Sequence, residues 1–148
     1  IGSVHLPRAL YGKMCESPLA IIEASVSTRV STIFNDYILS NYRDFKSLDS
    51  VNAPLLFAEF LMASLSKIER RLGSELHNEI STIMQDALKA QFEADDSSGH
   101  RVWIELLLRK YYDPMYDYQL SKKQHRIRFR GDSCEFLRWA LRLNSQVA

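Results

Sequence analysis

Most of the chain carries the spacing of hydrophobic residues that is typical of amphipathic helices. Apolar side chains recur every three or four positions, which predicts helices over residues 25–42, 54–72, 74–94 and 100–111. Gly73 separates the second helix from the third, Ser74 is expected to cap the third, and a polar loop follows at 95–99. Residues 54–94 are therefore expected to form a helical hairpin.

Each predicted helix has one face that is expected to be buried. In the helix over 25–42 this face consists of Val26, Val30, Ile33, Phe34, Tyr37 and Ile38. In the hairpin it consists of Leu55, Leu56, Ala58, Phe60, Leu61, Leu65, Ile68 and Leu72, and then Leu76, Ile80, Ile83, Met84, Ala87, Leu88 and Phe92. In the helix over 100–111 it consists of Val102, Trp103, Leu106 and Leu107.

Two short segments have β patterns instead. Residues 19–24 form an almost continuous apolar run after Ser17-Pro18, which predicts a strand buried on both faces, as in a parallel sheet. Residues 125–130 alternate strictly, which predicts a strand with Ile127 and Phe129 on one face and three arginines on the other.

Shorter helices are expected beside these strands. One covers residues 7–16, and another runs to about Ser121 after Asp113-Pro114 has interrupted the preceding helix. A last helix is expected after them, with Asp132 or Ser133 as its N-cap. It is expected to bury Phe136, Leu137, Trp139, Ala140, Leu141 and Leu143.

These elements predict a mostly helical α/β fold with few strands. A chain of 148 residues, 46% of them hydrophobic, fits one domain better than two. We divide 1–148 into a βα segment (1–50), a helical subdomain (53–121) and a basic strand with its terminal helix (125–148). The chain begins without Met and with a β-like run at 1–5, which suggests a fragment of a longer protein.

Composition narrows the class of protein further. Two cysteines cannot form a disulfide scaffold, and free thiols suit a reducing compartment, so a cytoplasmic location is expected. No apolar stretch approaches the roughly 18–20 residues of a membrane span, so no membrane partner is expected. Residues 1–100 carry nine basic and thirteen acidic side chains, whereas 101–148 carry ten basic and five acidic ones. A polyanion would therefore meet the carboxy-terminal part.

Motifs for catalysis and metal binding are missing from the sequence. Gly12-Lys13 lacks the surroundings of a phosphate-binding loop, and the cysteines and histidines have no metal-ligand spacing. We therefore predict no metal site and no catalytic residue in this chain. Cys134 is interpreted as a small buried hydrophobic residue, with a reactive thiol near arginines as the alternative.

The basic strand and its lead-in are the first candidate binding site. Its five cations are Lys122, Lys123, Arg126, Arg128 and Arg130. The three arginines would stand about 6.6–7 Å apart on one strand face and could meet successive phosphates of RNA. The alternative is a solvated edge strand whose charges prevent pairing with another chain.

A tyrosine-rich segment is the second candidate site. Tyr111, Tyr112, Tyr116 and Tyr118 surround Asp113 within eight residues. Exposed tyrosines stack on unpaired bases and a carboxylate accepts hydrogen bonds from a base or ribose. The alternative is that the tyrosines pack between helices.

Arg29 is the third candidate. It follows the predicted strand at 19–24, and ligands of open α/β sheets collect at the carboxyl ends of strands, where a phosphate would meet this guanidinium.

These segments together resemble a known family. The run Arg-Lys-Tyr-Tyr-Asp-Pro-Met-Tyr-Asp-Tyr-Gln-Leu at 109–120, followed by Arg-Ile-Arg-Phe-Arg-Gly-Asp at 126–132, closely resembles the carboxy-terminal region of bacterial tRNA 2-selenouridine synthases. Residues 1–11, 18–30 and 68–73 resemble the same family in the same order.

The resemblance implies an enzyme that replaces sulfur by selenium in 2-thiouridine at the tRNA wobble position. Selenophosphate is the selenium donor in that family, and an S-geranylated intermediate is made from geranyl diphosphate. A rhodanese-like domain with a catalytic cysteine and then a P-loop domain would precede Ile1, so we expect this chain alone to be inactive and to bind no cofactor. Its expected partners are tRNA and those upstream domains.

The resemblance also implies a fold and two hypotheses. The segments 19–24 and 127–129 would be neighbouring strands of a partial P-loop-type sheet, with the helical hairpin as an insertion, and Arg29 would face phosphates. In the first hypothesis the chain contacts tRNA or phosphate. In the second it is a non-catalytic helical module that docks on the missing rhodanese and P-loop domains through Leu56, Phe60, Ile83 and Phe92.

Overall fold

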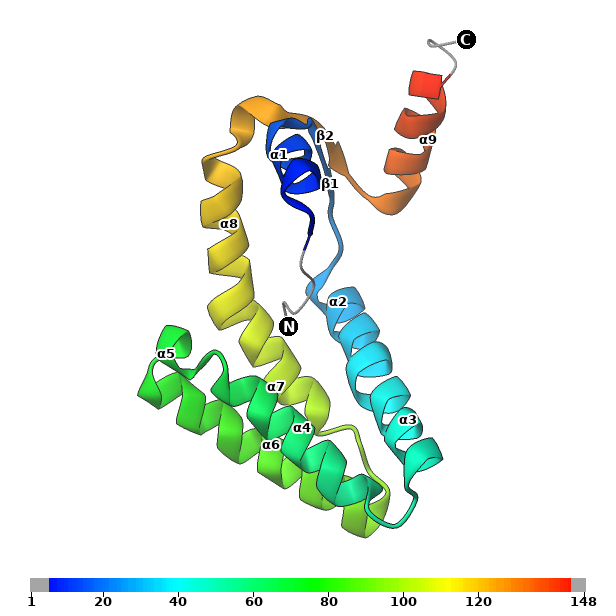
Figure 1. Cartoon of the computed structure of the whole chain (residues 1–148), viewed down its shortest axis with the longest axis vertical. Helices are drawn as coiled ribbons and strands as arrows, with labels where there is room; N and C mark the ends of the chain where they lie inside the picture. Colours follow the sequence, from blue (N-terminus) through cyan, green and yellow to red (C-terminus); the bar gives the residue numbers. More distant parts are fainter. Residues whose placement is uncertain (1–5, 145–148) are drawn as a thin grey trace. The chain divides into compact units, whose positions relative to one another are not determined.

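The computed structural model describes residues 6–144 (Figure 1). The β-like run expected at Ile1–His5 lies outside the described residues. The chain folds into two compact units: residues 1–25 with 116–148, here called the strand unit, and residues 26–115, here called the helical unit. None of the helices within 6–144 is long and apolar enough to cross a membrane.

The helical unit begins with one continuous helical segment that has a wider turn in its middle. It consists of α2 (Val26–Ile33), the π-helix η1 (Phe34–Ser40) and α3 (Asn41–Leu48). Val30, Phe34 and Ile38 are buried, as predicted. In an α-helix, residues four positions apart are displaced by about 40° around the helix axis at each repeat. A π turn contains more residues, so residues with this spacing, such as Val30, Phe34 and Ile38, stay on one side of the helix. The helix ends six residues after the predicted boundary at 42.

The predicted helical hairpin is confirmed. It consists of α4 (Ala53–Ser66), the short α5 (Glu69–Leu72) and α6 (Ser74–Ala94), and α4 packs against α6 (Figure 1). Gly73 has a φ of +79°, a conformation that glycine adopts readily, and it occupies the N-cap position expected for Ser74. The chain therefore reverses at this glycine.

The predicted buried face of α4 is partly wrong. Leu55 is 61% exposed and Leu56 38% exposed, whereas Phe57 is completely buried together with Leu61 and Leu65. The sequence of α4 is apolar on almost every side, so the spacing alone could not choose which side would pack. In α6 the predicted burial of Ile80, Met84, Ala87 and Leu88 is confirmed.

The predicted interruption at Asp113-Pro114 is wrong. Helix α7 (His100–Leu107) continues through the π-helix η2 (Leu108–Tyr112) into α8 (Asp113–Ser121). The Asp113 N–H donates to the Leu108 carbonyl, five residues back. Because the widened turn shifts the hydrogen-bonding register at this point, the helix accommodates a proline that lacks an N–H.

A buried polar network lies in the core of the helical unit. His100 is completely buried, its Nε2 lies 2.8 Å from Gln91 Oε1, and its Nδ1 accepts a hydrogen bond of 2.9 Å from the Trp103 indole. Trp103 and Leu107 are buried as predicted, whereas Val102 is 57% exposed and Ile104 is buried in its place. These bonds place a proton on Nε2 and leave Nδ1 as the acceptor, so the ring is neutral.

The strand unit contains the only sheet found within residues 6–144. Its elements are α1 (Arg8–Glu16), β1 (Leu19–Ile22), the 3-10 turn η3 (Gln124–Arg126), β2 (Ile127–Gly131) and α9 (Ser133–Asn144). Strands β1 and β2 pair in parallel, as the family resemblance implied, and Leu19 lies opposite Ile127. The fold is therefore the predicted mostly helical α/β type with few strands.

Burial in the strand unit differs from the prediction. Strand β1 ends at Ile22 and alternates between half-buried and exposed residues, so the expectation of two buried faces is wrong; Ile22 is 51% exposed. In α9 the side chains of Leu137, Leu141 and Leu143 are exposed. A sheet of two strands offers a narrow surface, and only the Phe136 and Trp139 side of α9 packs on Phe129 of β2.

The buried histidine makes stability depend on pH. Burial lowers the pKa of His100 to about 4, below the value near 6.5 in an unfolded chain. The neutral ring therefore contributes stability that is present above pH 6.5 and is lost as pH falls toward 4. We expect the His100 contribution to the free energy of unfolding to fall by roughly 2–3 kcal/mol over this window.

Urea unfolding of the wild-type chain and of His100→Gln at a series of pH values measures this contribution. The glutamine keeps hydrogen-bonding groups in the same place but does not titrate. Parallel pH profiles for the two proteins would show that His100 is not the group responsible.

Candidate nucleic-acid interface

The charge of the protein is divided between the two units. The strand unit carries nine basic and five acidic side chains, a net charge of +4, whereas the helical unit carries ten basic and thirteen acidic ones, a net charge of −3. The carboxy-terminal excess of positive charge seen in the sequence thus belongs largely to one compact body. A polyanion would be attracted to the strand unit.

The end of α8 and the turn after it supply the first cations. Lys122 is exposed, and its Nζ lies 4.1 Å from the centre of the Tyr118 ring, which is itself 62% exposed. A lysine over an accessible aromatic ring offers both a charge for phosphate and a face for base stacking. Lys123, the next candidate, is half-buried.

The arginines of β2 do not form the predicted row of three. Arg128 and Arg130 lie on the exposed face of the strand, and the alternation with Ile127 and Phe129 is confirmed. Arg128 Nη1 donates to the His125 carbonyl at 3.1 Å, and Arg130 Nη1 forms an ion pair with Glu23 Oε1 at 2.8 Å. Arg130 therefore already has a carboxylate partner on the segment that follows β1.

Arg126 lies before the strand, in η3, and its guanidinium is hydrogen-bonded to the backbone. Its Nη2 donates to the carbonyl oxygens of Met14 at 2.7 Å and Ser17 at 2.6 Å, and its Nε donates to Ser17 at 3.0 Å. These carbonyls belong to the end of α1 and the turn into β1. The guanidinium thus ties the two ends of the strand unit together.

The tyrosine-rich segment divides into packed and exposed residues. Tyr111 and Tyr112 are half-buried against the core of the helical unit, and their rings meet edge to face at 4.9 Å between centroids. Tyr116 and Tyr118 are 55% and 62% exposed. The packing interpretation therefore holds for the first pair, and stacking on a base is sterically open to the second.

Arg29 and Asp113, which belong to two separate sequence motifs, form one ion pair. Arg29 Nη1 and Nη2 donate to Asp113 Oδ1 and Oδ2 at 2.5 Å and 3.0 Å, and the side chains are 33% and 29% exposed. The hydrogen bond from Arg29 holds the pKa of Asp113 below its usual range, with a smaller electrostatic contribution from Arg109. A phosphate at Arg29 would have to compete with this carboxylate.

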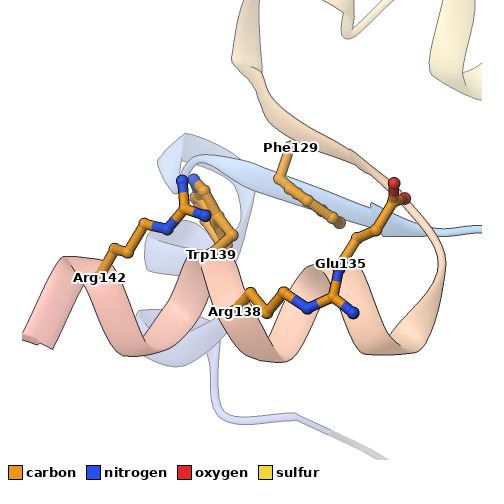
Figure 2. A pocket seen from close by; sticks show the side chains of 5 residues that line it. All are labelled: Phe129, Glu135, Arg138, Trp139 and Arg142. Atoms are coloured by element: carbon orange, nitrogen blue, oxygen red, sulfur yellow. The ribbon is translucent and has the colours of Figure 1, made fainter.

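A pocket that the sequence patterns did not reveal lies between β2 and α9. Its lining consists of Phe129, Glu135, Arg138, Trp139 and Arg142 (Figure 2), and its volume is about 290 Å³. The spacing of Arg138 and Arg142, four residues apart on a helix with Trp139 between them, was a signal for this site. The hydrophobic spacing of α9 instead predicts that Trp139 is buried among the leucines of this helix.

The cysteines and metal ligands can be placed as well. Cys15 and Cys134 are both exposed and unpaired, so the expectation that Cys134 is buried is wrong. Within residues 6–144 no group of three or more histidine, cysteine, aspartate or glutamate side chains is arranged to hold a metal ion.

Comparison with known proteins decides the family. A family model described as the tRNA 2-selenouridine synthase AAA domain matches residues 1–146. The chain belongs to this family. Proteins named tRNA 2-selenouridine synthase are similar to it: the one from Shewanella woodyi is 37% identical over 140 residues, and that from Pseudomonas putida is 40% identical over 136 residues.

The match covers most of this chain and a smaller part of each relative. It includes 94% of the chain and 38% of the Shewanella woodyi protein, and 91% of the chain and 37% of the Pseudomonas putida protein. The synthase from Marinobacter nauticus is 38% identical over 141 residues, which are 95% of the chain and 38% of that protein. No solved structure matches the chain.

The ion pair between Arg29 and Asp113 is expected to stabilise the helical unit. Because its two side chains are about one-third exposed, we expect Arg29→Gln and Asp113→Asn each to lower the free energy of unfolding by about 1 kcal/mol. Asp113 has a lowered pKa, so its contribution is present above pH 4 and is lost as pH falls through the folded pKa. A double-mutant cycle in urea measures the coupling, and additive effects of the two substitutions would contradict it.

The structural role of Arg126 gives a separate prediction. Replacement by glutamine removes charge-assisted hydrogen bonds to two backbone carbonyls, and we expect a loss of about 1–2 kcal/mol of stability. Arg128→Gln, which removes one bond to a carbonyl three residues away, is the matched control and should cost less. Thermal or urea unfolding compares them, and equal losses would argue against the proposed anchor.

Proposed function

We propose that this protein is part of a tRNA-modifying enzyme and that its strand unit contacts tRNA. The observation that carries the proposal is the net charge of the strand unit, which is +4, whereas that of the helical unit is −3. Exposed Lys122, Tyr118 and Arg128 supply a cation, a stacking face and a guanidinium on that unit. RNA is bound through this combination of phosphate contacts and stacking.

The reaction of the intact enzyme follows from the family resemblance. We propose that it replaces sulfur by selenium in 2-thiouridine at the wobble position of tRNA, with selenophosphate as donor and an S-geranylated intermediate made from geranyl diphosphate. The names of the relatives support a selenouridine product. We assign the rhodanese cysteine and the P-loop to other parts of a cytoplasmic enzyme, and the 148-residue chain alone is expected to be inactive.

We propose Arg29 as a further phosphate contact, one that forms only when the phosphate displaces the Asp113 carboxylate. In the structure its guanidinium is held by the Asp113 carboxylate. A carboxylate and a phosphate occupy the same fork of an arginine, so a bound phosphate would take over donors that Asp113 now uses. Tyr111 and Tyr112 support the segment that carries Asp113 through their packing and are not proposed to stack on bases.

A docking role is the second candidate function, and exposed apolar side chains favour it. Of the residues expected to form the docking surface, Phe60, Ile83 and Phe92 are half-buried and pack against the core of the helical unit, whereas Leu56 is 38% exposed. The exposed apolar side chains of the strand unit include those of Leu6, Leu10, Tyr11 and Met14 near or on α1, and those of Leu137 and Leu141 on α9. Binding of the rhodanese and P-loop parts of a relative without RNA would support this role.

Two matched double substitutions test the contact with tRNA. Lys122→Gln with Arg128→Gln removes two charges from the strand unit, and Arg43→Gln with Lys89→Gln removes two exposed charges from the helical unit. We expect the first pair to weaken binding of an unmodified tRNA transcript about tenfold and to lower the slope of log affinity against log salt by about 1–2. The second pair should change both quantities much less.

Filter binding at several salt concentrations gives both quantities. Equal effects of the two pairs would mean that tRNA responds only to total charge, and the strand unit would lose its assignment.

A further inference from the structure

The pocket between β2 and α9 has an aromatic wall. The Phe129 and Trp139 rings stack with centroids 5.1 Å apart and an angle of 27° between their planes, and Phe136 meets both rings at 5.8 Å and 5.9 Å. All three side chains are half-buried, so part of this aromatic surface remains accessible. Such a surface suits a planar ring, because base–aromatic stacking is worth about 1–3 kcal/mol per base.

Two arginines complete the pocket. Arg138 and Arg142 extend from neighbouring turns of α9 and both line the pocket, Arg142 toward Trp139 and Arg138 toward Glu135 (Figure 2). Arg138 is exposed and takes part in none of the ion pairs found within residues 6–144. Two guanidinium groups separated by one helical turn can both reach a single phosphate group.

Glu135, the acidic residue of the pocket, is hydrogen-bonded within the turn between β2 and α9. Asp132 N–H donates to Glu135 Oε2 at 3.0 Å, and Glu135 N–H donates to Asp132 Oδ1 at 2.8 Å, which is a reciprocal cap at the start of α9. The predicted cap by Asp132 is thereby confirmed. Glu135 is thus oriented by the backbone, and Arg138, which also lines the pocket, is in none of the ion pairs found among the described residues.

Gly131 holds the turn in this tight form. A Cβ at position 131 would collide with the Glu135 carboxylate and would come within 2.9 Å of the Phe129 ring. The last residue of β2 must therefore be small for the cap and the aromatic wall to coexist. The pocket is built by the fold before any ligand arrives, which lowers the entropy cost of binding.

We propose that this pocket binds an unpaired nucleotide of RNA, with the base against Phe129 and Trp139 and the phosphate at Arg138 and Arg142. The volume of about 290 Å³ accommodates a pyrimidine nucleotide, and the +4 charge of the strand unit favours an anionic ligand over a peptide segment. This inference rests on the proposed function for its RNA source and adds a defined nucleotide site to it.

The two tryptophans give a direct readout by ¹H–¹⁵N NMR of the 148-residue chain. Trp103 is 5% exposed in the helical unit and its indole is bound to His100, whereas Trp139 lines the pocket. We expect UMP and a short oligouridylate to shift the Trp139 indole signal, which Trp139→Phe identifies by its loss. The Trp103 signal should not move.

Substitution of the arginines tests the geometry. Arg138→Gln with Arg142→Gln should weaken UMP binding about tenfold, because the stacking surface remains while the phosphate contacts are lost. Arg8→Gln on α1, an exposed arginine of the same unit outside the pocket, is the control and should leave binding unchanged. Absence of a shift of the Trp139 signal overturns the proposal, and this is also the result expected if a protein segment fills the pocket. The same shift in the double variant overturns it as well.

Binding of an unmodified tRNA transcript separates this inference from the proposed function. An affinity for tRNA that is lowered in the double variant supports both. Normal tRNA binding by the double variant removes the pocket from the RNA surface and leaves the proposed function intact. If UMP shifts the Trp139 signal but the chain does not bind tRNA, the pocket binds free nucleotides. This result would overturn both the proposal that its ligand is a nucleotide of RNA and the proposed role of the strand unit.

Discussion

The parallel pairing of β1 with β2 is the contact on which the strand unit depends. It pairs Leu19 with Ile127, two residues that are separated in the sequence by the whole helical unit. The hydrogen bonds between the two segments continue to the Glu23 N–H, which donates to the Gly131 carbonyl at 2.8 Å. Arg126 and the Arg130–Glu23 ion pair reinforce the same junction from side chains. The pocket then follows from it, because β2 presents Phe129 to α9 only when the strand is held in place.

Arginine has three different uses in this small protein. Arg126 binds backbone carbonyls, Arg29 and Arg130 bind carboxylates, and Arg138 lines a pocket and joins none of the ion pairs that the structure describes within 6–144. A guanidinium that already makes charge-assisted hydrogen bonds gives up stability when it turns to a ligand, whereas one at a prebuilt pocket does not. The net charge of the strand unit attracts a polyanion, but its arginines differ in how readily each can bind a phosphate.

The helical unit is organised around widened turns and one buried polar network. The π-helical segments η1 and η2 keep Val30, Phe34 and Ile38 on one side and admit Pro114 without a break. The second of these turns also directs Asp113 toward Arg29. In a family whose relatives are much longer than this chain, the helical unit thus brings its own core and its own ion pair.

The sequence by itself determined the helices, the hairpin, the two strands and the uneven charge, because these depend on periodicity and on glycine and proline over short distances. The resemblance to relatives also paired the two strands correctly. Only the tertiary structure decided which side of the apolar helix α4 is buried, that Arg29 meets Asp113, that Arg126 is an anchor and that Trp139 lines a pocket. Those outcomes depend on which distant segments pack together, and a charge or an aromatic ring in a sequence does not specify its partner.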